Sequence, residues 1–156
     1  MTISLTLLEY LEWAGVDYEV IPHKYTENSL QTAKTAHVPA NKLAKCVLLE
    51  DENDYLMAVL PADHRIKLSS LHRQLNRNLE LASESEVAYL FSDCDIGAIP
   101  PIGQAYGYEV IVDDSLTGCD DIYFEAGDHR DLVHLSGRDF REIMGNARQG
   151  HFSQQA

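Results

Sequence analysis

Two features of the sequence could take part in the chemistry of an acyl group, a lysine beside an apolar run and a turn rich in glycine and proline. Lys45 precedes the run "CVLL", so its surroundings are expected to be partly dehydrated. A compact ammonium group can attract a phosphate or a carbonyl oxygen, and loss of water strengthens that attraction. From the residues alone, an ordinary surface lysine at a strand edge is the alternative.

The second feature is the stretch "DCDIGAIPPIG" at residues 93–103. Gly97 can take backbone conformations that are closed to other residues, and Pro100 and Pro101 stiffen the chain that follows. A rigid turn of this kind can hold main-chain N–H groups, here those from Gly97 to Ile99, in a fixed direction, as an oxyanion hole requires. A plain tight turn between a helix and a strand is the alternative that composition leaves open.

Neither an activated nucleophile nor a metal site is indicated. No glycine-flanked nucleophile turn surrounds Ser92 or Cys94, and we expect Cys94 to be a small loop or core residue. No pair of histidines has the spacing of a metal site, so we predict no metal and no cofactor. His129 is expected in a hairpin turn, where a plain solvent-exposed residue is an open alternative, and His134 is expected in the last long strand, in the core or at the surface.

Length and composition favour one domain over residues 1–156, with a core at about 15–145 and a polar, frayed tail at 146–156. The first residues lack the basic region of a signal peptide, and no apolar run approaches the length of a membrane span. The three cysteines are far apart and odd in number, which favours free thiols and a cytoplasmic location.

The charge is strongly negative but uneven. The net charge is −13, which argues against a protein that coats nucleic acid. Residues 23–48 and 64–77 nevertheless hold 8 of the 12 basic residues and only 1 of the 25 acidic ones. Such a basic face could hold one phosphate-bearing end without gripping a long duplex. Two ordinary solvated helix faces would give the same pattern.

Helix and strand patterns alternate along the chain. We expect helices at about 4–15, 29–36, 66–76, 83–92 and 136–145, several with capping residues, and Leu5, Leu8 and Leu11 on one buried face of the first. Strands are expected near 17–23 and 108–113, and hairpins at 46–60 and 121–136. Hairpins require antiparallel pairs, so the fold class is α+β, with a mixed, largely antiparallel curved sheet surrounded by helices.

The ordered set of motifs resembles the YbaK family, the free-standing relatives of the editing domain inserted in bacterial prolyl-tRNA synthetases. "GAIPP" matches the family's Gly-x-x-x-Pro motif, and Lys45 in "LAKCVLL" matches its functional lysine. "VLPADHRIKLSSL", "LASESEVAYLF", "YEVIVDDSL" and "YFEAGDHRDLVHLSGRDF" resemble its other segments in the same order. The resemblance covers roughly residues 15–145.

The resemblance implies a trans-acting aminoacyl-tRNA deacylase that hydrolyses the ester of a small, wrongly attached amino acid such as Ala or Cys, with tRNA(Pro) as the expected carrier. The resemblance also implies a direct attack by water, aided by the substrate's ribose hydroxyl, without a covalent intermediate. The implied catalytic residues are Lys45, Gly97 and Pro101, and the implied substrate-binding residues are His23, Ile99, Pro100, Ile102 and His129.

The implied partners are the aminoacyl-tRNA 3′ end and, as a further candidate, a tRNA synthetase. A non-catalytic aminoacyl- or nucleotide-binding regulatory module of the same fold is the alternative. The sequence leaves the amino acid, the preferred tRNA and the oligomeric state open.

Overall fold

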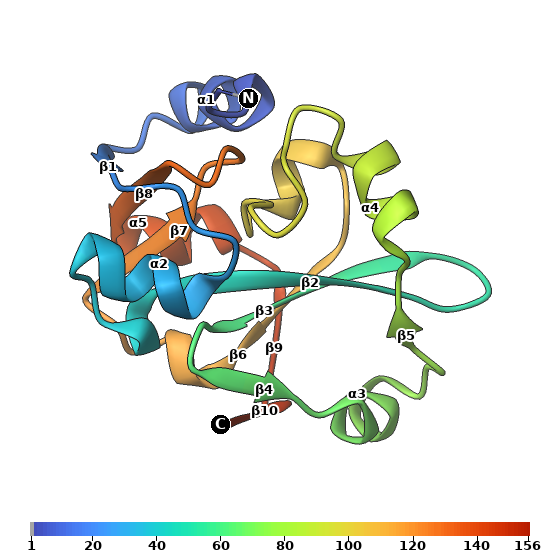
Figure 1. Cartoon of the computed structure of the whole chain (residues 1–156). Coiled ribbons are helices and arrows are strands. Elements are labelled where there is room, and N and C mark those ends of the chain that lie inside the picture. Colours follow the sequence, from blue (N-terminus) through green and yellow to red (C-terminus); the bar gives the residue numbers. More distant parts are fainter. Residues whose placement is uncertain (1) are drawn as a thin grey trace.

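A computed structural model describes residues 2–156, which form five α-helices and ten strands (Figure 1). The helices are α1 (Leu5–Ala14), α2 (Ser29–Ala36), α3 (Leu68–Leu75), α4 (Glu84–Leu90) and α5 (Gly137–Met144). The strands are β1 (Glu19–Pro22), β2 (Ala44–Glu50), β3 (Tyr55–Pro61), β4 (His64–Ile66), β5 (Glu80–Leu81), β6 (Val110–Asp113), β7 (Asp121–Glu125), β8 (Asp131–Ser136), β9 (Arg148–Gly150) and β10 (Ser153–Gln155).

The strands form three sheets instead of one. The largest has the order β5-β2-β3-β6-β9, in which β2 pairs antiparallel with β3 and β5, whereas β3–β6 and β6–β9 are parallel. A second sheet, β1-β8-β7, is antiparallel throughout, and β4 pairs antiparallel with β10. The predicted α+β class and the predominance of antiparallel pairs are therefore confirmed.

Local capping signals set the ends of several helices. The Ser4 side chain accepts a hydrogen bond from the Leu7 N–H, and Gly15 ends α1 in a left-handed conformation. Ser83 and Glu86 form the predicted capping box at the start of α4. The predicted buried face of α1 is partly wrong, because Leu7 and Leu11 are buried while Leu5 is 63% exposed.

The long β2–β3 hairpin crosses the middle of the molecule and separates two regions (Figure 1). On one side lie α1 and the loop between α4 and β6, and on the other lie α3, β4 and the C-terminal end. Apolar residues of β3 are fully buried because both faces of this strand are covered. Among the described residues, no helix is long and apolar enough to cross a membrane.

The prediction of a frayed tail is wrong. β9 extends the large sheet beside β6, and β10 pairs with β4. The Phe152 side chain between them is fully buried and packs against apolar residues of β3, β6 and α3. The polar composition of residues 146–156 does not indicate these two strands, because a single large apolar side chain is enough to anchor them.

We expect Phe152→Ala to lower the free energy of unfolding by about 3–5 kcal/mol, because it leaves a cavity in a packed core. Chemical denaturation followed by circular dichroism measures this loss. Gln154→Ala, at an exposed position of β10, is the matched control and should change stability by less than about 0.5 kcal/mol. Equal stability of the wild-type and Phe152→Ala proteins would show that the tail is not anchored.

Candidate functional site

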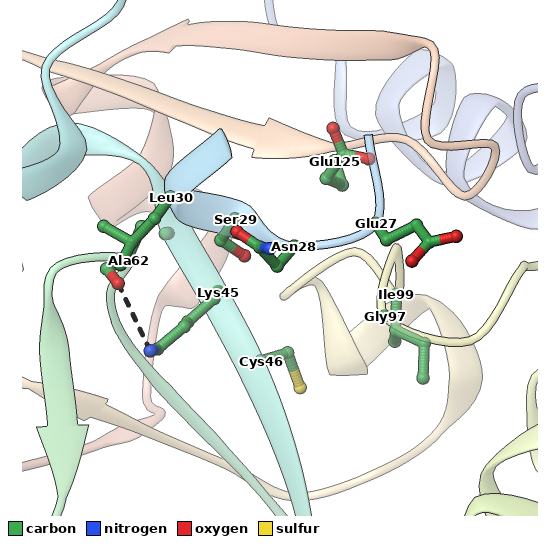
Figure 2. A pocket seen from close by; sticks show the side chains of 11 residues that line it. Glu27, Asn28, Ser29, Leu30, Lys45, Cys46, Ala62, Gly97, Ile99 and Glu125 are labelled. Atoms are coloured by element: carbon green, nitrogen blue, oxygen red, sulfur yellow. Dashed lines mark hydrogen bonds between the residues drawn. The ribbon is translucent and has the colours of Figure 1, made fainter. Parts of the chain in front are cut away.

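One open cavity of about 450 Å³ brings together segments that lie far apart in the sequence (Figure 2). It is lined by residues 27–30 at the start of α2, residues 44–46 of β2, Ala62, Gly97, Ile99 and Glu125. The predicted lysine and the predicted glycine turn therefore border one hollow. A volume of this size is in the range of small-molecule sites.

Lys45 reaches into this cavity from β2, and its ammonium group is held by main-chain carbonyls. Its Nζ donates to the carbonyl oxygens of His64 (2.7 Å) and Ala62 (3.3 Å), the second of which is drawn in Figure 2. An ammonium group has three donors, so one remains for a ligand. Burial lowers the pKa of Lys45, and the nearby Asp63 carboxylate partly offsets this effect.

The carbonyls that hold Lys45 belong to a segment that β10 braces. The Ser153 Oγ lies 2.8 Å from His64 Nδ1, and the Ala156 N–H donates to the Asp63 carbonyl (2.9 Å). The C-terminal strand thus fixes the place of the lysine acceptors, although it contributes no lining residue to the cavity.

The glycine turn is built as its sequence suggests. The Ala98 N–H donates to the Asp95 carbonyl (3.1 Å), and Gly97, the third residue of this turn, has φ +87°. These are the features of a type II turn, which favours glycine at this position. Within residues 2–156 the N–H groups of Gly97 and Ile99 have no hydrogen-bond partner, so both are available to a ligand.

His129 is buried beside this turn, so its alternative as a solvent-exposed turn residue is wrong. It is 3% exposed, and its Nε2 lies 2.6 Å from the Ile96 carbonyl oxygen. A carbonyl only accepts, so this nitrogen carries the proton. A methyl group at Gly97 would lie 3.2 Å from the His129 ring, which shows how closely the two pack.

Glu125, at the end of β7, is a lining residue that sequence reasoning missed. It is 5% exposed, and its Oε1 lies 2.8 Å from Nε2 of the predicted site residue His23. Burial is the main cause that raises the pKa of Glu125 to about 8. The residues in hydrogen-bond contact here are 102 positions apart, so no local pattern could have revealed them.

Pro100, Pro101 and Ile102 were also predicted as site residues, and the structure places them behind the turn. All three are buried and none is among the residues that line the cavity. Ile102 packs in the core cluster that contains Leu7 and Phe91. Their burial behind the turn is consistent with a structural role, in which they pack against the turn and do not contact the substrate.

The thiols are not poised for nucleophilic attack. Cys46 lines the cavity and Cys94 lies beneath the turn, and burial raises the pKa of each to about 12. Cys94 is buried, as predicted for a small loop or core residue. A thiol with so high a pKa is almost entirely protonated at neutral pH, and the thiolate is the reactive form.

The two basic segments differ in their surroundings. The first runs past the cavity, to which it contributes residues 27–30 and Lys45. In the second, Arg77 forms an ion pair with Asp51 (2.7 Å) at the turn of the β2–β3 hairpin. Lys45 is therefore the one lysine or arginine among the described residues that line the cavity, where Glu27 and Glu125 also lie.

Two further groups of titratable side chains lie outside the cavity lining: His134 with its acidic neighbours, and a cluster of Asp113, Asp114 and His151. His134 lies between Glu19 (2.7 Å) and Asp121 (2.8 Å), which raise its pKa against the effect of burial. Asp113, Asp114 and His151 bring ligand atoms within 4.8 Å of one another. The absence of a metal site accordingly stays a prediction.

Comparisons with solved structures agree on the fold. The hypothetical protein APE2540 is 22% identical with a TM-score of 0.85, over 96% of this chain and 99% of its own. A candidate trans-editing enzyme for prolyl-tRNA synthetase is 19% identical, with a TM-score of 0.84 over 97% and 96% of the two chains. A chain described as a signal transduction protein, from Marinobacter aquaeolei VT8, matches with 17% identity and a TM-score of 0.79, over 97% of this chain and 31% of its own.

No curated protein sequence matches the chain. The model of the aminoacyl-tRNA editing domain, however, matches residues 23–143, which include every residue that lines the cavity. With most of its length covered by that match and its fold shared with such proteins, the chain belongs to the aminoacyl-tRNA editing domain family.

Proposed function

We propose that this chain acts in trans as an aminoacyl-tRNA deacylase, which hydrolyses the ester between a wrongly attached small amino acid and tRNA(Pro). The observation that carries the proposal is that Lys45, Gly97 and Ile99 line one cavity, and that within residues 2–156 the N–H groups of Gly97 and Ile99 have no hydrogen-bond partner. Membership of the editing-domain family supports the class of reaction.

The proposed reaction needs no nucleophile from the protein. Water, oriented by the ribose hydroxyl beside the ester, attacks the ester carbonyl, and the C–O bond to the ribose breaks while the ribose oxygen takes a proton. The products are the free amino acid and uncharged tRNA. The N–H groups of Gly97 and Ile99 stabilise the oxyanion of the tetrahedral intermediate. One such donor typically lowers the activation free energy by about 3 kcal/mol.

Lys45 supplies the positive charge in this scheme. Two of its donors are used on the carbonyls of Ala62 and His64, which fix the direction of the third. The third meets either the substrate carbonyl or the terminal phosphate. Because the group is already partly dehydrated and held, little reorganisation is needed when the charge of the transition state develops.

Small side chains around Lys45 favour a small amino acid. Ala44, Cys46 and Ala62 line the cavity on this side, with Ile99 opposite in the turn. The side chains of alanine and cysteine are small enough to fit between these residues. The open side of the cavity, here called the rim, would receive the nucleoside. Leu30, which is 52% exposed, lies on this rim and offers an apolar contact to the terminal adenosine.

We propose the tRNA 3′ end as the partner, with a tRNA synthetase as a further one, in the cytoplasm. The net charge of −13 favours contact with few phosphates, and Lys45 supplies a cation at the cavity. The cysteines among the described residues are all free thiols, as expected in a reducing compartment.

We expect Lys45→Ala to lower the rate of amino acid release from alanyl- or cysteinyl-tRNA(Pro) by at least about tenfold, which corresponds to about 1.4 kcal/mol in the barrier. The rate is measured as loss of acid-precipitable label from the charged tRNA. Arg148→Met, which removes an exposed cation away from the cavity, should release the amino acid at the wild-type rate.

Equal rates for wild type and Lys45→Ala would remove Lys45 from the mechanism. If the wild-type protein released no amino acid from any of a panel of mischarged tRNAs, a non-catalytic binding module would be the better account of the chain.

We also expect Gly97→Ala to lower kcat by at least about tenfold, since the new methyl group meets His129 and the Glu27 carbonyl at 3.2–3.4 Å and displaces the amide donors. Gly107→Ala is the matched control: its φ is +79°, so the backbone strain is similar, but no atom lies within 4 Å of the added methyl group. Comparable kcat values for the two variants would argue against a role for the turn.

A further inference from the structure

Glu125 is a buried carboxyl that the proposed reaction does not use, and a histidine lies next to each of its two oxygens. Its Oε1 lies 2.8 Å from His23 Nε2, and its Oε2 lies 3.7 Å from His129 Nδ1. Within residues 2–156, Oε2 has no hydrogen-bond partner. A buried carboxyl oxygen without a partner is costly, which suggests a reason beyond packing for keeping an acid at this position.

The hydrogen bonds of the two histidines restrict where protons can be. His23 Nδ1 lies 2.7 Å from the Lys24 carbonyl oxygen, and His129 Nε2 lies 2.6 Å from the Ile96 carbonyl oxygen. Each of these nitrogens must donate, so a neutral histidine turns its bare nitrogen toward Glu125. The short contact between His23 and Glu125 then needs one proton, which a protonated carboxyl supplies.

The surroundings favour the protonated carboxyl. Besides His23 after β1, the groups that face Glu125 are the Thr32 hydroxyl of α2, Asp128 and His129 of the β7–β8 turn, and Asp131 of β8. Burial is the largest cause and raises the pKa of Glu125 to about 8; His129 opposes it, the two aspartates add to it, and Thr32 has the smallest effect, in the opposite direction.

These contacts connect Glu125 to both walls of the cavity. His23 begins the segment that continues into the lining residues 27–30, and His129 holds the turn at Ile96 and Gly97. We propose that Glu125 is a positioning residue, whose neutral carboxyl donates a hydrogen bond to His23 and packs against His129, and thereby sets the distance between the wall at 27–30 and the amides of the turn. This inference rests on the proposed hydrolysis.

The test compares Glu125→Gln with Glu125→Ala. The glutamine amide can donate to His23 Nε2 as the protonated carboxyl does, so Glu125→Gln should keep kcat within threefold of wild type at pH 7. Glu125→Ala removes both contacts and should lower kcat at least tenfold with less than a threefold change in KM. Glu109→Gln, an exposed acid away from the cavity, controls for the loss of one carboxyl.

The pH dependence separates positioning from a merely structural role. After subtraction of spontaneous ester hydrolysis, wild-type kcat should fall as the pH rises through about 8, because the carboxyl then ionises, whereas kcat of Glu125→Gln should stay level from pH 6 to 9. The same alkaline fall in both proteins, or a tenfold loss in Glu125→Gln at pH 7, would overturn the proposal.

A stability measurement tests the neutral carboxyl without any substrate. The folded protein keeps this proton at pH values where the unfolded chain has released it, so the stabilisation from Glu125 falls as the pH rises from about 4.5 to about 8. The Tm of Glu125→Gln minus the Tm of wild type should therefore increase as the pH rises across this range. A Tm of Glu125→Gln that stays constant or falls relative to that of wild type across this range would refute the neutral carboxyl, whereas an inactive wild type with the expected Tm trend would refute only the hydrolysis.

Discussion

The main chain of the β7–β8 turn, residues 126–130, is the constraint on which the site depends. Its carbonyl oxygens accept hydrogen bonds from three distant segments: Ala126 from the Ser4 N–H (2.8 Å), Gly127 from the Asp95 N–H (2.7 Å), and Arg130 from the His23 N–H (2.7 Å). Gly127 leaves no spare room, because an added methyl group would lie 3.2 Å from Cys94 Sγ and Ser4. The start of α1, the glycine turn and the segment that enters α2 are thereby held against one short hairpin turn.

This arrangement suits a reaction in which the protein positions groups and does not form bonds with the substrate. The donors proposed to act on the ester are main-chain amides and one lysine, and each is held by neighbouring groups. Lys45 depends on the carbonyls of Ala62 and His64, and the Gly97 turn depends on His129. Electrostatic stabilisation requires such fixed donors, since mobile dipoles would have to be reoriented at a cost in each reaction cycle.

The sequence could predict features that depend on neighbouring residues and could not predict those that depend on distant ones. Capping at Ser4 and Ser83, the two hairpins and the glycine turn follow from local hydrogen bonding and backbone preferences, and the structure has all of them. Lys45 and Gly97 were identified as candidate site residues from family motifs, and both line one cavity in the structure.

Other features required contacts across the chain. The burial of His129 and the pairing of Glu125 with His23 depend on the association of β1 with β8, which a polar turn sequence does not reveal. The order of the C-terminal residues depends on the single side chain of Phe152 and on strand partners almost ninety residues away. In both cases the local pattern is that of an ordinary polar loop.

The pairing of β10 with β4 also has a consequence for synthesis on the ribosome. Residues 64–66 emerge early, but residues 153–155, which brace them, emerge only after nearly all of the intervening chain has been translated. Until then the carbonyls that orient Lys45 lack their support. A nascent chain would therefore carry an unfinished site until β9 has joined the large sheet and β10 has paired with β4.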